Sequence, residues 1–144
     1  MKKPIIIPLI LLIIAILVGP YIAGNLLFSV NKSFEINWGI SVPDGFQKVY
    51  HVKTAGFHGD GGRFSVFEAK GESDPKLSNF EWGRNTSVEL FVNTIMADLE
   101  VPKDKRPASD DYYWKSYSKE EDGSSMIIIY SPEDKRMYFV EKHL

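Results

Sequence analysis

The first thirty residues constrain this chain more than any other segment, because Lys2 and Lys3 precede an apolar run that carries no charge until Lys32. A helix of about 20 apolar residues spans the hydrocarbon core of a bilayer, and residues 9–28 supply that length. Pro20 would kink such a helix rather than end it, because neighbouring groups or water can satisfy the freed carbonyl. We therefore expect these thirty residues to form a transmembrane anchor.

The orientation of this anchor follows from its flanking charges. Because the only lysines beside the apolar run precede it, the positive-inside rule keeps the N-terminus in the cytoplasm and places residues 31–144 outside the cell membrane. A cleaved secretory signal has the same basic start and apolar core, and a cut near Gly24 would release a soluble secreted protein. We favour the retained single-pass anchor, since neither Tyr21 nor Ile22 is the small residue expected three positions before the cut.

Composition limits what the exported part can be. Its length of about 114 residues suits one domain with a modest core. The chain contains no cysteine, which excludes a disulfide framework, a thiolate zinc site and a cysteine nucleophile, and favours a bacterial surface over an animal secreted module. Of the 17 basic residues, two precede the anchor, which leaves 15 against 19 acidic ones. Without a basic cluster, nucleic acid is not an expected partner.

Six runs have the alternation or the β-branched and aromatic content that is typical of strands: residues 34–42, 46–53, 63–70, 112–118, 125–130 and 136–142. Turn-forming sequences separate the last three. The run 126–130 is apolar without alternation, which predicts burial on both faces and therefore a central place in the sheet.

A helix is predicted from about residue 87 to residue 100. Thr86 with Glu89 three residues later resembles a capping box, and Pro102 ends the pattern. Six apolar residues fall on one helical face: Val88, Phe91, Val92, Ile95, Met96 and Leu99. Such a face needs a flat apolar partner. We therefore predict an α+β fold, in which the N-terminal transmembrane helix (1–30) precedes one domain (31–144) with a mostly antiparallel sheet, in the order β-β-β-α-β-β-β, and this helix packed on it.

The segment from Gly56 to Arg63 is rich in glycine and contains His58 and Asp60. An imidazole and a carboxylate on one loop suit proton transfer or metal binding. Zinc needs three or four side-chain ligands and calcium about six or more oxygens, and the loop offers only two such side chains. We favour a hairpin whose glycines permit positive φ, and expect no metal and no cofactor. An enzyme or metal-dependent site at His58, Asp60 and Arg63 is the alternative.

Aromatic residues cluster at Tyr112, Tyr113 and Trp114. Tyrosine and tryptophan are favoured in recognition surfaces because they bury a large area while ordering few torsions. They also fill sheet cores, and core packing is the interpretation we favour. Because no Gly-x-Ser-x-Gly motif occurs, the leading functional hypothesis is a small membrane-anchored interaction module that captures a protein partner at the cell surface, rather than an enzyme.

Overall fold

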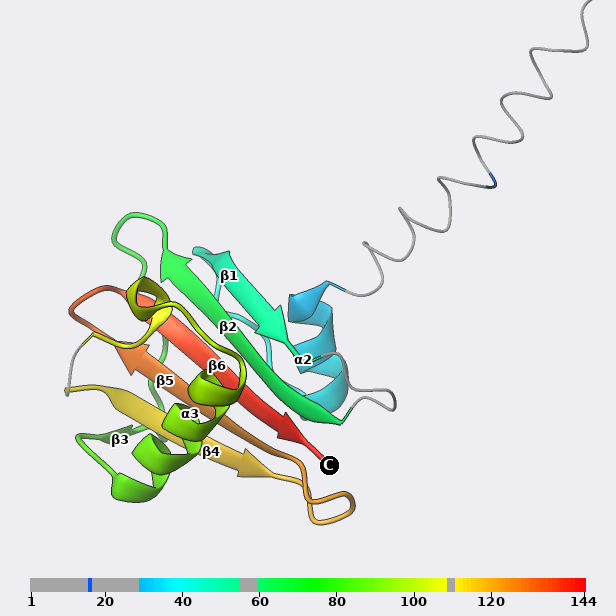
Figure 1. Ribbon diagram of the computed structural model, residues 1–144. Coiled ribbons are helices and arrows are strands. Elements are labelled where there is room, and N and C mark those ends of the chain that lie inside the picture. Colours follow the sequence, from blue (N-terminus) through cyan, green and yellow to red (C-terminus); the bar gives the residue numbers. More distant parts are fainter. Residues whose placement is uncertain (1–15, 17–28, 55–59, 109–110) are drawn as a thin grey trace, which may run out of the picture. The chain divides into compact units, whose positions relative to one another are not determined.

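The computed structural model describes residue 16 and residues 29–54, 60–108 and 111–144 (Figure 1). Nearly all of the predicted anchor therefore lies outside the described residues, and no helix among those that are described is long and apolar enough to cross a membrane. The chain divides into two units, Met1–Val42 and Pro43–Leu144, which are described separately.

The first unit contains helix α2 (Val30–Trp38), where a strand over residues 34–42 was predicted. That prediction is wrong. Ser29 caps the helix by accepting the Lys32 N–H, and Gly39 ends it with a φ of 66°. Apolar residues at 34 and 38 fit a helix as well as a strand, since they are four positions apart. The alternation of apolar and polar residues between them led to the incorrect strand prediction.

The second unit contains a six-stranded antiparallel sheet with the spatial order β1-β2-β6-β5-β4-β3. Its strands are β1 (Phe46–Lys53), β2 (Gly61–Ala69), β3 (Glu81–Trp82), β4 (Tyr113–Ser118), β5 (Ser125–Ser131) and β6 (Arg136–His143). Five of them match predicted runs to within two residues. The predicted order is wrong at two places: residues 34–42 belong to a helix rather than to the first strand, and the strand before α3 is the short edge strand β3, where no strand was predicted. The α+β class is confirmed.

Strand β5 lies between β4 and β6. All its residues from Met126 to Ser131 are buried, whichever face they point to, which confirms the prediction of an inner strand buried on both sides.

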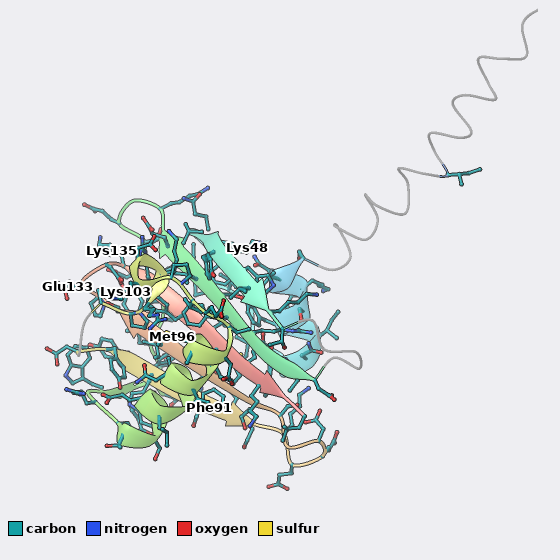
Figure 2. The ribbon with its side chains drawn as sticks, viewed as in Figure 1. Lys48, Phe91, Met96, Lys103, Glu133 and Lys135 are labelled. Carbon is teal, nitrogen blue, oxygen red and sulfur yellow. The ribbon has the colours of Figure 1, made fainter. Side chains whose placement is uncertain are left out.

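Helix α3 (Thr86–Asp98) lies across one face of the sheet (Figure 1). Its buried residues pack with apolar side chains of the sheet in one core cluster: Phe64, Val66, Ile127, Ile129, Tyr138 and Val140. Met96 and Phe91 both lie on α3 (Figure 2). Met96 is buried, whereas Phe91 is only half-buried against this cluster. The predicted apolar face is otherwise confirmed, and Leu90 on the far side of the helix is 69% exposed.

The C-terminus of α3 is a Schellman turn. The Val101 N–H bonds to the Met96 carbonyl at 3.0 Å and the Glu100 N–H to the Ala97 carbonyl at 3.1 Å, while Glu100 has a φ of 51°. The helix therefore ends at Asp98, two residues earlier than predicted, and Pro102 precedes a short 3₁₀ helix, η1 (Lys103–Lys105).

Candidate functional site

A cleft lies between the N-terminal half of α3 and the strands β4 and β5, and we call it the α3–β4 cleft. Its volume is about 350 Å³, within the range of small-molecule sites. Five apolar residues line it: Val88, Phe91, Trp114, Met126 and Ile127. Four hydroxyl groups line it as well, from Ser87, Ser116, Ser118 and Ser125.

Among the residues that the structure describes, no charged side chain lines the α3–β4 cleft. The serine hydroxyls can donate and accept hydrogen bonds, while the apolar residues favour a group that leaves water. An unpaired ionised group would bury its charge here without an opposite one. The cleft therefore suits an uncharged, largely apolar group with a few polar atoms.

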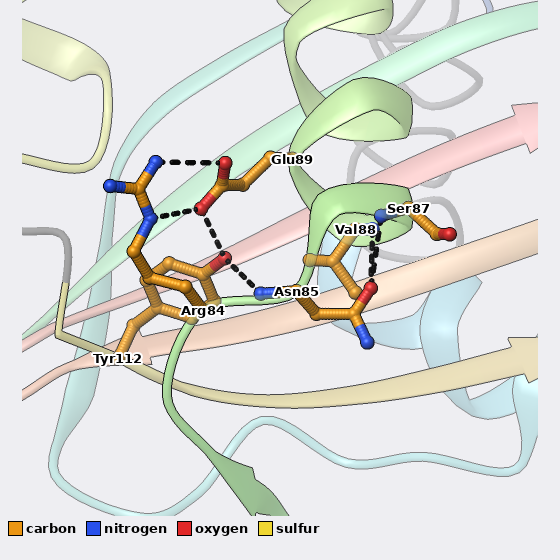
Figure 3. A network of polar contacts seen from close by, with 6 residues as sticks. All are labelled: Arg84, Asn85, Ser87, Val88, Glu89 and Tyr112. Carbon is orange, nitrogen blue, oxygen red and sulfur yellow. Dashed lines mark hydrogen bonds and ion pairs between the residues drawn. The ribbon is translucent and has the colours of Figure 1, made fainter.

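The first turn of α3 forms one wall of the cleft, and its amides are capped by Asn85 (Figure 3). The Asn85 Oδ1 accepts the N–H of Ser87 at 3.0 Å and that of Val88 at 3.2 Å. The predicted capping box of Thr86 and Glu89 is wrong, because Thr86 is already the first helical residue. Since these two amides are occupied, they do not provide an anion site.

Glu89 instead joins a network that ties the start of α3 to the sheet (Figure 3). Its carboxylate accepts hydrogen bonds from Arg84, at 2.7 Å from Nε and 3.0 Å from Nη2, and from the Tyr112 hydroxyl at 3.3 Å. The Arg84 hydrogen bonds hold the pKa of Glu89 below its usual value. Burial raises the pKa of Tyr112, and the Glu89 charge raises it further. The network attaches the start of α3, through Asn85 and Glu89, to Tyr112 beside the first residue of β4.

The three predicted aromatic residues do not share one face. Side chains alternate along a strand, and Tyr112 and Trp114 are buried in the core under α3, where Trp114 also lines the cleft. Tyr113 is half-buried and contacts Trp82, with ring centroids 4.4 Å apart, and Tyr130 at 6.4 Å. Trp82 is 57% exposed. Tyr113 and Trp82 thus form a separate aromatic pair at the β3 edge.

The glycine-rich loop is only partly described, and His58 lies outside the described residues. Asp60 is exposed, and Arg63 lies half-buried within β2. Among residues 29–54, 60–108 and 111–144, no group of three or more histidine or acidic side chains could hold a metal ion. The loop prediction therefore stays untested at its central residue.

Two histidine pairs lie elsewhere on the sheet. His51 Nδ1 is 2.9 Å from the hydroxyl of Ser65, which is directly opposite it on β2. Burial, followed by the nearby Lys48, lowers the pKa of His51. The buried carboxylate of Glu141 bonds to His143 at 3.1 Å. Glu141 also acts electrostatically on His51 and opposes the lowering of its pKa, so the two pairs belong to the same part of the sheet.

Sequence reasoning missed the cleft, although one signal was present. Trp114, Ser116 and Ser118 alternate along β4, so a period of two already assigns them to one face. The α3 wall could not be placed opposite them without the sheet order.

No protein-family model matches this chain, and neither a curated protein nor a solved structure matches it.

Proposed function

We propose that this protein is a membrane-anchored extracytoplasmic binding module whose α3–β4 cleft receives an uncharged, largely apolar group of a protein partner. The observation that carries the proposal is the lining of the cleft, in which apolar side chains and serine hydroxyls occur together without a charged group. A preformed apolar concavity with a few polar groups is the usual form of a binding site.

The anchor is the second part of the proposal. Residues 9–28 cross the cell membrane once, with Lys2 and Lys3 on the cytoplasmic side. Protease added to intact spheroplasts is expected to digest residues 31–144. Protection of this part until the membrane is breached would show that the orientation is wrong, and its appearance in the medium would show that the leader is cleaved.

Binding in the cleft can be tested without knowing the natural partner. The probe is a phage library of random 12-residue peptides, selected on the full-length protein in lipid nanodiscs. Each selected peptide is then measured against Ser116→Trp, which places a large ring in the cleft, and against Leu90→Trp, which changes an exposed residue outside it.

We expect selected peptides to bind the wild type and Leu90→Trp equally and Ser116→Trp at least tenfold more weakly. Recovery of no peptide, or of peptides that bind all three proteins alike, would contradict a binding function for the cleft.

A further inference from the structure

The edge of β4 beside the cleft is only half covered. Strand β3 pairs with Tyr113 and Trp114 alone. It cannot continue along β4, because the Phe80 N–H turns back to the Leu77 carbonyl at 3.0 Å and Asn79 has a φ of 65°. Among the residues that the structure describes, no strand pairs with β4 beyond Trp114 on this side.

Two hydrogen bonds show which backbone groups face this open edge. The Tyr112 carbonyl accepts from Gly83, on the β3 side, and the Lys119 N–H donates to Ser124, on the β5 side. Directions alternate along an antiparallel strand. The N–H and carbonyl groups of Ser116 and Ser118 therefore point away from β5, toward the open edge.

The same two serines line the α3–β4 cleft. In an antiparallel pair, residues directly opposite each other have their side chains on the same face of the sheet. A residue that exchanged hydrogen bonds with Ser116 would thus direct its side chain toward the cleft.

We propose that the partner binds as an extended segment that adds a strand to the open edge of β4, in line with β3, and inserts a large apolar side chain into the cleft. This inference rests on the proposed function and specifies its partner class. Addition of a strand gives affinity through backbone hydrogen bonds and specificity through alternate side chains.

Charge disfavours a second copy of this chain in the register that would use both outward amides. If Ser116 of one copy paired with Ser118 of another, Lys115 would lie directly opposite Lys119, and like charges in that position are destabilising. A partner residue with a carboxylate opposite Lys115 would be favoured instead. The expected segment therefore has an acidic residue next to the apolar residue that enters the cleft.

Hydrogen exchange tests the pairing on the full-length protein in nanodiscs, with the selected peptides as the probe. We expect the amides of Ser116 and Ser118 to exchange at least about tenfold more slowly when a peptide is bound, and replacement of the peptide's acidic residue by lysine to weaken binding.

Proline substitution provides a second test. Ser116→Pro removes only the outward N–H, which an edge strand tolerates, and is expected to weaken binding by up to about tenfold through loss of one hydrogen bond. Comparison with Ser116→Ala separates the amide from the hydroxyl. Lys53→Pro at the opposite edge of the sheet is the matched control and should bind normally. If Ser116→Pro does not fold, as judged by circular dichroism, the exchange measurement on the wild type decides.

Each result separates the two proposals. Peptides that need the cleft but leave the exchange of both serine amides unchanged would overturn strand addition and leave the proposed function standing. If the amides of Ser116 and Ser118 exchange more slowly at higher protein concentration without any peptide, a second copy occupies the edge. That result would overturn the proposal of a foreign partner. If the library yields no peptide at all, both proposals are wrong.

Discussion

The N-cap of α3 provides the sharpest test of how the cleft wall is built. Asn85→Ala removes the oxygen that accepts the amides of Ser87 and Val88 at 3.0 and 3.2 Å. Two hydrogen bonds at about 0.5–1.5 kcal/mol each set an upper bound of about 3 kcal/mol. Because Ser87 is exposed, water can replace the bond to its amide. We therefore expect a loss of about 1 kcal/mol, as is typical for N-caps.

The neighbouring threonine is the matched control. Thr86 is exposed and lies inside the helix, so Thr86→Ala should change the free energy of unfolding by less than about 0.5 kcal/mol. Asn85→Asp keeps a cap oxygen and adds a charge that suits a helix N-terminus, so it should retain wild-type stability. Urea titrations of the full-length protein in detergent micelles, followed by tryptophan fluorescence, give these values. Equal losses for Asn85→Ala and Thr86→Ala would refute the assignment of the cap.

Three further changes test the core, a turn and a histidine. Ile95→Ala, at a side chain 4% exposed, should cost about 2–5 kcal/mol in urea titrations. Gly61→Ala should cost about 1–3 kcal/mol in the same assay, because Gly61 has a φ of 121° and a Cβ there would lie 1.8 Å from the Thr54 hydroxyl oxygen. The pKa of His51 is lowered from 6.5 by burial, so the unfolded state binds the proton more readily, and stability should be fully present above pH 6.5 and fall as the pH drops through the folded pKa. His51→Gln should flatten that dependence in unfolding curves recorded between pH 5 and 8, and an unchanged slope would contradict the assignment.

The sequence predicted the elements whose periodicity extends over many residues. The apolar face of α3 recurs at helical spacing through Ile95 and Met96, and burial against the sheet is what that spacing requires. The apolar run of β5 likewise required cover on both faces. In these segments, tertiary packing and local pattern favour the same structure.

The failures lie where a short segment satisfies two patterns. Phe34 and Trp38 fit either a strand or one side of a helix, and caps at Ser29 and Gly39 decide for the helix. The choice between Asn85 and Thr86 as N-cap is similar, since both side chains have an oxygen that can accept an amide. Only the backbone at Asn85, with a φ of −140° and a ψ of 118°, identifies the residue that precedes the helix.

The cleft depends on sheet order, which pattern alone does not give. Its two walls, on α3 and β4, are separated along the chain, and the edge stays open because Asn79 turns the chain away from β4. Along β4, side chains alternate between the two faces of the sheet, as Tyr113 and Trp114 do, and backbone N–H groups alternate between its two edges. Ser116 and Ser118 therefore have both an outward N–H and a side chain that faces the cleft. Backbone pairing at this edge is therefore coupled to the cleft: a strand that bonds to Ser116 must present its side chain to the cleft, and one shifted by a single residue would present it to the opposite face.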